Sequence, residues 1–304
     1  MKLASISWFA ATLLLAGLAA GPAAAASGHL TLDVGGLKRT ALIVEHARLK
    51  KARRPVVVVL HGYKGDGARI RRNLGLEAIF GASGAILVFP DAYEKRWAVS
   101  GPPRPNVDDP GFIRALATEL VAQGIGDRRH IYIAGVSTGG MMALRIACEN
   151  ADMIAGAAII GANMPKELSS ACKPARPVPF LLINGTADPR MPYQGGATTD
   201  MDVDGPVVST DETLAHFSQI AGCKDEPSEV PLPSRSPKTG MRAVLERFEG
   251  CKVPVELVKI EGGGHGVPGP GGGGSSSGAA NGPHNTDVDA ARLIFEFFAR
   301  LKGA

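Results

Sequence analysis

One short segment of the chain has the residue types and spacing of a nucleophilic serine site. Ser137 lies between Gly135 and Gly139, directly after the apolar stretch 131–134 and directly before a helical pattern over 138–150. A tight strand-to-helix turn holds such a serine in a strained conformation, and the glycines leave room for the adjacent backbone. The segment therefore predicts an exposed Ser137 hydroxyl that acts as a nucleophile, rather than a structural serine.

A serine nucleophile needs a base and a carboxylate, and both follow Ser137 in the chain order that this turn requires. Asp188 comes after the apolar segment 179–183, and His265 comes after 255–260 within a glycine-rich loop. We expect His265 to accept the serine proton and Asp188 to orient the imidazole, although Asp188 before a proline is also typical of an Asx-turn. The competing residues are Asp152, Asp200, Asp202, Asp204, Asp211, His216 and His284.

The loop after the apolar run 56–60 is predicted to complete this site. His61 follows the run directly and precedes the serine in the chain, which favours a structural role for its side chain. The backbone N–H groups of Tyr63 and Thr138 are the expected oxyanion hole. Trp97 lies on the loop after 85–89, where it is expected to wall an acyl or alcohol pocket, with a core or surface position as the alternative.

Alternating strand and helix patterns must position these residues. Residues 30–34 and 38–44 predict a hairpin around Gly35 and Gly36. Apolar runs typical of strands covered on both faces occur at 56–60, 85–89, 131–134, 155–160 and 179–183 and, less purely, at 255–260. Helical patterns lie between them near 69–80, 111–123, 138–150, 211–221 and 287–301. The alternation predicts an α/β fold with a doubly wound, mostly parallel sheet and a ligand site at the carboxyl ends of its strands.

Length and composition are those of one globular domain. The chain has 304 residues, of which 45% are hydrophobic, and its formal charge is +4 from 33 basic and 29 acidic side chains. These values exclude a disordered or fibrous chain. The densest basic run, 48–54, has no interleaved aromatic residues and is interpreted as a solvated loop. Nucleic acid is therefore not expected as a partner.

The N-terminal segment has the pattern of a secretory signal peptide. Residues 1–26 begin with Met1 and Lys2, continue through an apolar stretch and end in four alanines before polar Ser27. This pattern favours a cleaved signal peptide over a membrane anchor. We expect residues 27–304 to form the mature catalytic domain, a periplasmic or extracellular protein without a stable membrane anchor.

Four cysteines are consistent with export to an oxidising compartment, where an even number favours disulfides. Three pairings are possible. We favour the sequential one, in which Cys148 joins Cys172 and Cys223 joins Cys251. The first bond would tie the helix after the serine turn to the loop before the next strand, and the second would close a proline- and serine-rich excursion. A metal site is the competing interpretation, but the spacing lacks a CxxC or a histidine-rich cluster, and no metal is expected.

Several segments in order along nearly the whole mature chain resemble the polyhydroxybutyrate depolymerase-like esterases. They are Leu60-His61-Gly62, Phe89-Pro90-Asp91, Trp97, 108–112, the serine turn through Met142, 184–189 with Pro192-Tyr193, and 262–265. The resemblance implies an α/β-hydrolase fold and a secreted serine ester hydrolase that needs no cofactor. It also implies Ser137, Asp188 and His265 as the triad, and it supports the sequential disulfides.

The resemblance leaves the substrate open within one chemical class. It implies short-chain hydroxyalkanoate oligomers or related soluble esters, and the same branch contains feruloyl and acetylxylan esterases. Tyr63 stands where a cysteine is frequent in the oxyanion loop, and Thr138 replaces a common asparagine or glutamine. An acyltransferase of the same fold and a binding protein on a hydrolase scaffold are the other hypotheses.

Overall fold

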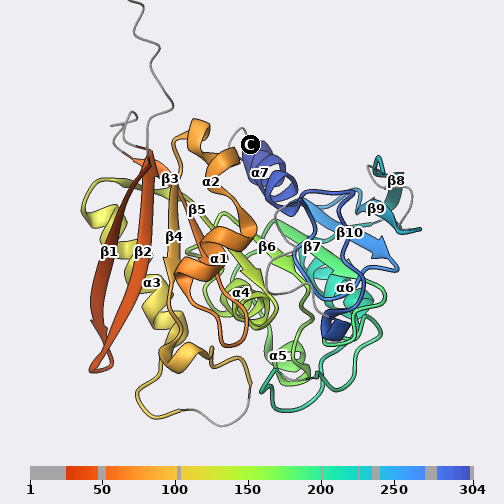
Figure 1. The fold of residues 1–304 in the computed structure, drawn as a ribbon, viewed down its shortest axis with the longest axis horizontal. Coiled ribbons are helices and arrows are strands. Elements are labelled where there is room, and N and C mark those ends of the chain that lie inside the picture. The colour runs from red at the N-terminus through yellow and green to blue at the C-terminus, as the bar shows by residue number, and fades with distance from the viewer. Residues whose placement is uncertain are drawn as a thin grey trace, which may run out of the picture.

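A ten-stranded sheet forms the centre of the protein in the computed structural model, which describes residues 25–46, 53–100, 104–199, 201–224, 226–234, 240–270 and 279–301 (Figure 1). Residues 1–24 of the expected signal peptide, most of the basic run 48–54 and the glycine-rich segment 271–278 lie outside the described residues.

The strand order is β1-β2-β4-β3-β5-β6-β7-β10-β9-β8. The strands are β1 (Ala25–Val34), β2 (Leu37–His46), β3 (Arg54–Leu60), β4 (Ile86–Pro90), β5 (Gly126–Val136), β6 (Gly156–Ile160), β7 (Phe180–Gly185), β8 (Ser228–Pro231), β9 (Arg242–Arg247) and β10 (Val255–Glu261). The six from β4 to β10 in this order are parallel, and antiparallel strands follow at both edges. The mostly parallel sheet and the N-terminal hairpin are confirmed.

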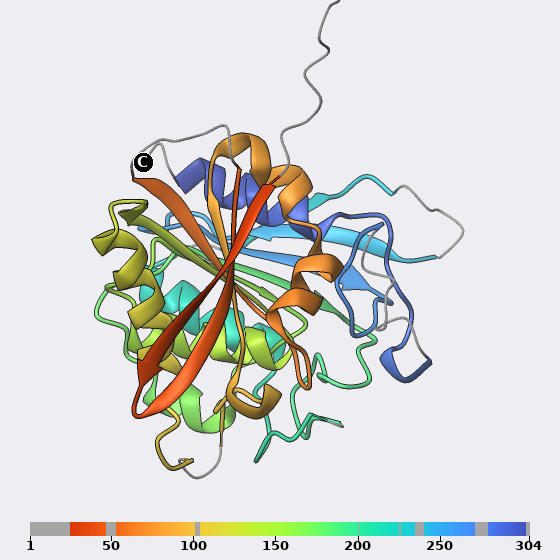
Figure 2. The same cartoon turned by 60° about the vertical axis from the view of Figure 1, so that its left-hand side comes forward.

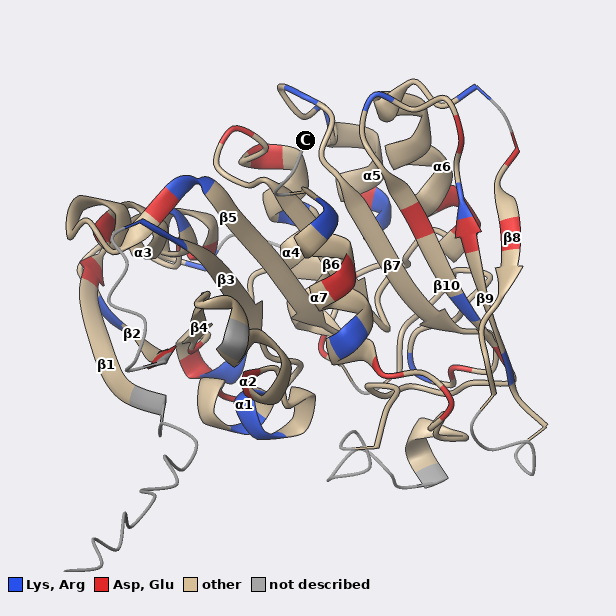
Figure 3. Cartoon of the chain, turned by 90° about the horizontal axis from the view of Figure 1, so that it is seen from above, with Lys and Arg blue, Asp and Glu red and all other residues tan. Residues whose placement is uncertain are grey.

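Helices cover both faces of the sheet, as Figure 3 shows from above. They are α1 (Gly67–Leu74), α2 (Glu77–Phe80), α3 (Asp109–Ala122), α4 (Thr138–Glu149), α5 (Lys166–Ala171), α6 (Thr210–Ala221) and α7 (Ala290–Arg300). Apolar residues of α3, α4 and α6 pack on one face, and those of α1, α2 and α7 pack on the other. The protein therefore has the α/β-hydrolase arrangement of a central sheet between two helical layers.

Strand β3 shows why its apolar run is continuous. Val56, Val58 and Leu60 belong to the core on the α3 and α4 side, whereas Val57 and Val59 belong to the core on the α1 and α7 side. Because successive side chains of a strand point to opposite faces, coverage of both faces makes every position of the run 56–60 apolar. All five side chains are buried.

The sheet brings four connections to one edge. The sheet is twisted: in Figure 2 the β1–β2 hairpin, in red at the front, runs at an angle to the later strands behind it. The segments that follow β3, β5, β7 and β10 leave the carboxyl ends of neighbouring or nearby parallel strands. They carry His61, Ser137, Asp188 and His265, so residues separated by more than 200 positions (265 − 61 = 204) reach one region.

Two disulfides join the predicted partners. Cys148 at the end of α4 is bonded to Cys172 after α5, and Cys223 after α6 is bonded to Cys251 before β10. The bonds close 24 and 28 residues, loop lengths at which the chain-entropy model gives about 3.5 kcal/mol each. Within the described ranges no helix is long and apolar enough to cross a bilayer.

Candidate active site

The turn between β5 and α4 places Ser137 in the strained conformation that its glycines predict. Its φ is 56° and its ψ is −125°, and its backbone N–H donates to the Ile160 carbonyl at 2.9 Å. A Cβ atom on Gly135 would lie 2.2 Å from the Gly139 oxygen, and one on Gly139 would lie 2.4 Å from the His61 oxygen. Only glycine fits at either position, so the turn can present the serine at the sheet edge.

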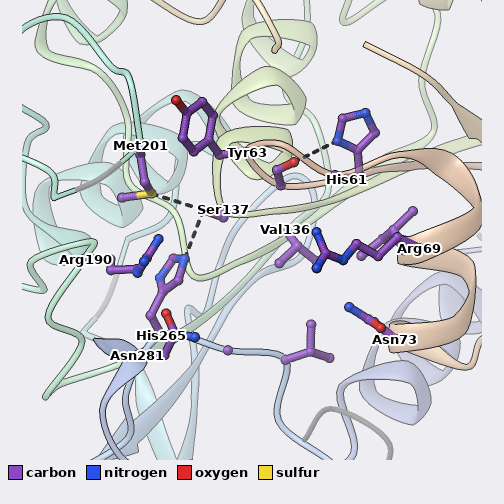
Figure 4. A pocket seen from close by; sticks show the side chains of 15 residues that line it. His61, Tyr63, Arg69, Asn73, Val136, Ser137, Arg190, Met201, His265 and Asn281 are labelled. Atoms are coloured by element: carbon purple, nitrogen blue, oxygen red, sulfur yellow. Dashed lines mark hydrogen bonds between the residues drawn. The ribbon is translucent and has the colours of Figure 1, made fainter. Parts of the chain in front are cut away.

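Ser137, His265 and Asp188 form one continuous hydrogen-bonded chain (Figure 4 shows the Ser137–His265 contact). The distance between His265 Nε2 and Ser137 Oγ is 3.0 Å, and that between His265 Nδ1 and Asp188 Oδ2 is 2.7 Å. An ionised carboxylate can only accept hydrogen bonds, so His265 Nδ1 must carry the proton that it donates to Asp188. The other ring nitrogen, Nε2, is then unprotonated and accepts from the Ser137 hydroxyl. The histidine is therefore in the tautomer of a general base.

The second oxygen of Asp188 is held by the backbone. Asp188 Oδ1 accepts hydrogen bonds from the N–H groups of Arg190 and Met191, both at 2.8 Å, and its side chain is only 2% exposed. The carboxylate thus has a fixed orientation and no ion pair with a lysine or arginine side chain in the described residues. Its orientation depends on the local turn after β7.

The competing residues have other partners. Asp152 pairs with Arg114, Asp202 pairs with Arg96, and Asp211 accepts from the Tyr193 hydroxyl. His216 is in α6 beside Phe217, and His284 Nε2 donates to the Gly269 carbonyl. Asp204 offers its backbone N–H to Ser100, and Asp200 lies outside the described residues.

The loops that carry Asp188 and His265 are packed against each other. A Cβ atom on Gly185 would lie 2.2 Å from the Gly263 oxygen, so the two backbones touch where the loops leave β7 and β10. The Ala187 N–H donates to that same oxygen at 2.9 Å, and the Gly262 N–H donates to Thr186 Oγ1 at 2.9 Å. The two loops form one hydrogen-bonded unit beside the serine turn.

His61 supports the neighbouring loop, as its structural interpretation expects. Its Nε2 accepts from the Ala92 N–H at 3.0 Å, and its Nδ1 lies 2.7 Å from the Gly62 carbonyl, to which it donates. Both ring nitrogens are therefore satisfied by backbone in the neutral form. The imidazole is 1% exposed, and its burial lowers its pKa below the usual value for histidine.

Trp97 differs from the pocket wall expected for it. The side chain is 5% exposed, and it is absent from the residues that line the cavity at Ser137. Its indole N–H donates to the His61 carbonyl at 2.8 Å, and its ring lies 5.1 Å from the His61 imidazole, centre to centre. A buried indole N–H needs an acceptor, and the His61 carbonyl supplies it. Trp97 therefore packs in the core and supports the loop that begins at His61.

The two residues expected to supply the oxyanion hole belong to segments that adjoin Ser137. Thr138 is the first residue of α4, where backbone N–H groups have no partner within the helix. Tyr63 lines the same cavity as Ser137. Gly62 brings this loop close, since a Cβ atom there would lie 3.3 Å from Ser137 Cβ.

Met201 contacts the serine from a loop that the sequence analysis did not assign to the site. Its Sδ atom lies 3.1 Å from Ser137 Oγ, and its side chain is 2% exposed. A thioether is a weak acceptor, so the imidazole nitrogen remains the stronger acceptor of the serine proton. No local pattern marks Met201, because its position depends on the path of a loop 64 residues further along the chain.

A small cavity opens at Ser137. Its volume is about 200 Å³, below the roughly 300–1,000 Å³ typical of drug-sized ligand sites. Arg69, Asn73, Arg190 and Asn281 are polar side chains among the residues that line it, and the sequence analysis assigned none of the four to the site. Among the described residues no group of three or more His, Cys, Asp or Glu side chains is arranged to hold a metal ion.

Curated proteins similar to this chain are named as esterases. NocK of Nocardia uniformis subsp. tsuyamanensis, a protein assigned as an esterase, is 34% identical over 230 residues, which cover 71% of this chain and 66% of NocK. Feruloyl esterase B of Piromyces equi is 34% identical over 60% of this chain and 34% of its own length. Feruloyl esterase C of Emericella nidulans is 28% identical over 67% and 65%. The chain thus spans less than two thirds of these relatives, and no family model matches it.

Solved structures share the fold. Acetyl xylan esterase from Aspergillus awamori superposes with a TM-score of 0.58 at 13% identity, over 90% of this chain and 99% of that one. A thermostable esterase superposes with a TM-score of 0.55 at 14% identity, over 91% and 62%. The protein therefore has the α/β-hydrolase fold.

The lowered pKa of His61 predicts a pH-dependent stability. Below about pH 6.5 the unfolded chain takes up a proton that the folded His61 does not, so stability present above that pH is lost as pH falls toward the lowered native pKa. The slope for one proton is at most about 1.4 kcal/mol per pH unit. Denaturant unfolding between about pH 7.5 and 5 should give a shallower loss for His61→Gln than for the wild type.

His29→Gln is the matched control, because His29 is exposed on β1. It should keep the wild-type slope, and His216, whose pKa burial also lowers, contributes equally to all three proteins. Equal slopes for the wild type and His61→Gln would contradict the prediction.

Proposed function

We propose that this protein is a serine carboxylic ester hydrolase in which Ser137 is the nucleophile, His265 the general base and Asp188 the carboxylate that orients the imidazole. The observation that carries the proposal is the hydrogen-bonded chain of 2.7 and 3.0 Å from Asp188 Oδ2 through His265 to Ser137 Oγ. The similarity to proteins named as esterases supports ester bonds as the target.

The reaction follows from this geometry in two halves. Ser137 Oγ attacks the ester carbonyl carbon while His265 Nε2 takes its proton, and the same nitrogen then protonates the departing alcohol. The acyl group is left on Ser137 Oγ. Water then attacks that acyl carbon, gives its proton to His265, and the proton returns to Ser137 as the carboxylic acid leaves. Asp188 stabilises the imidazolium formed in each half.

The negative charge on the carbonyl oxygen is assigned to two backbone donors. The Thr138 N–H at the start of α4 benefits from the positive end of the helix, and the Tyr63 N–H comes from the loop that His61 and Trp97 hold. His61 and Trp97 are therefore positioning residues. Their contacts fix the position of the Tyr63 N–H before the substrate binds.

Short, soluble esters are the substrates that the cavity favours. A volume of about 200 Å³ encloses only a small acyl or alcohol group. Hydroxyalkanoate oligomers are one candidate class, because the sequence motifs resemble those of the polyhydroxybutyrate depolymerase-like esterases. Feruloyl esters are the second, because two of the similar proteins are named feruloyl esterases. The two disulfides support export, since cytosolic thiols are kept reduced.

A covalent probe tests the chemistry. A fluorophosphonate should label the wild-type protein once, at Ser137, by peptide mapping, and the labelled protein should no longer hydrolyse p-nitrophenyl acetate. Specific activities on hydroxybutyrate trimer, methyl ferulate, acetylated xylan and crystalline polyhydroxybutyrate film then assign the substrate class, with the soluble esters expected to exceed the film. Labelling elsewhere, or retained activity after complete labelling, would contradict the proposal.

A further inference from the structure

Met201 lies against the reacting oxygen of the proposed nucleophile. Its Sδ atom is 3.1 Å from Ser137 Oγ, and the residue lines the cavity at Ser137 although only 2% of it is exposed. An ester carbonyl carbon must come within about 3–3.5 Å of Oγ before the new bond forms. The thioether occupies the same range of distances, so a substrate that is bound for attack contacts Met201.

A second hollow of about 600 Å³ adjoins the cavity of about 200 Å³ at Ser137. Tyr63 and Arg190 line both of them. Met201 lines the inner cavity, whereas the next residue, Asp202, lines the outer hollow. Figure 4 shows Met201, Tyr63 and Arg190 on one side of Ser137. At Met201 and Asp202 the chain therefore passes between the two spaces, and the methionine faces the inner one.

Contacts on both sides of Met201 hold its loop in place. Before it, the Thr199 N–H donates to the Arg190 carbonyl at 3.0 Å. After it, the Asp202 carboxylate pairs with the Arg96 guanidinium. The loop is thus tied to the turn that follows the catalytic aspartate and to the segment that follows β4. These two ties fix the backbone from which the thioether reaches the serine.

We propose that Met201 limits the size of the substrate, because its side chain closes the cavity at Ser137 toward the outer hollow. A methionine side chain is unbranched and apolar, and it offers a substrate van der Waals contact without a hydrogen-bond donor. A short group fits between Met201 and the serine, whereas a longer group meets the thioether before its carbonyl carbon reaches Oγ. This inference rests on the proposed ester hydrolysis and names the residue that sets its size limit.

Two series of esters of increasing length test this size limit. In the first series, the acyl group of a p-nitrophenyl ester grows from acetate through butyrate to hexanoate. In the second, the alcohol group of an acetate ester grows from ethyl through butyl to hexyl. For each series we compare the kcat/KM of the longest member with that of the shortest. In Met201→Ala this ratio should rise about tenfold or more over the wild type in one series, which identifies the part of the ester that faces Met201.

Variants of graded size separate the volume of the side chain from other effects. Met201→Val should raise the ratio less than Met201→Ala, and it carries the same comparison if the alanine variant does not fold. Met201→Leu should keep the wild-type ratio, because leucine and methionine have similar volumes. Met153→Ala is the matched control, since Met153 is a half-buried methionine that does not line this cavity. A smaller fraction of active enzyme lowers kcat/KM for every ester by the same factor, so it cancels in the ratio.

The outcomes separate the two proposals. Hydrolysis of p-nitrophenyl acetate by Met201→Ala with the wild-type ratio in both series would overturn the size limit and leave the ester hydrolase intact. An equal rise in Met201→Leu or in Met153→Ala would also overturn it, because the volume of the side chain at position 201 would then not be the cause. Failure of the wild type to hydrolyse any ester would overturn the proposed function, and this inference with it.

Discussion

Ser137→Ala is expected to lower kcat for p-nitrophenyl acetate by about five to six orders of magnitude, because the proposed mechanism carries the acyl group on the Ser137 hydroxyl oxygen, which alanine lacks. The melting temperature should stay close to that of the wild type. Alanine keeps the Cβ atom and the positive φ of 56° at this turn, and the substitution removes only the hydroxyl contacts to His265 and Met201.

Ser218→Ala is the matched control for this variant. Ser218 is a buried serine of α6 whose hydroxyl donates to the Ala215 carbonyl, outside the cavity. It should retain wild-type kcat. Activity of Ser137→Ala within a hundredfold of the wild type would show that another residue is the nucleophile, whereas equal losses in both serine variants would indicate a general effect on the fold.

Asp188→Asn has the second largest expected effect, a loss of about 10³–10⁴ in kcat/KM. An asparagine amide keeps the size of the side chain, but it cannot stabilise the imidazolium, and its NH₂ group can turn His265 into the tautomer with the proton on Nε2. Ser137 then faces a donor in place of an acceptor. Initial rates with p-nitrophenyl acetate at several pH values measure the loss.

Asp211→Asn provides the comparison for the loss of one carboxylate. Asp211 accepts from the Tyr193 hydroxyl at 3.1 Å and does not line the cavity at Ser137. Its activity should stay close to that of the wild type, because Asp211 contacts neither Ser137 nor His265 in the described structure. An Asp188→Asn enzyme as active as Asp211→Asn would assign the carboxylate role to another residue.

The parallel core of the sheet could be predicted because burial on both faces leaves a continuous apolar run. The elements β8, β9 and α5 were missed for different reasons. All four residues of β8 are exposed and none of the six residues of α5 is buried, so neither has an apolar pattern. Strand β9 has four buried residues, but one of them is Glu246 and an arginine lies at each end. Their structure depends on neighbours that local periodicity does not record.

The site residues also fall into a group that the sequence could locate and a group that it could not. Ser137, Asp188 and His265 could be located because each follows an apolar strand in a fixed chain order, and the structure brings their side chains together. Met201 and Arg190 line the cavity from irregular loops. Such loops have no helical or strand periodicity from which the direction of a side chain could be predicted. Trp97 shows the limit most clearly, since its loop was identified but its inward direction depends on an acceptor at His61.

The contact between the loops after β7 and β10 has a consequence for how the site can open. Gly185 and Gly263 touch through their backbones, and the Ala187 N–H is bonded across the same contact, so Asp188 and His265 are carried by one body. Ser137 belongs to a different body, the β5–α4 turn, joined to the first at this point by the 3.0 Å contact with His265 Nε2. We therefore expect a thermal displacement of the loops to lengthen the serine–histidine distance before it breaks the histidine–aspartate hydrogen bond, so that the imidazole returns to the serine in the same tautomer.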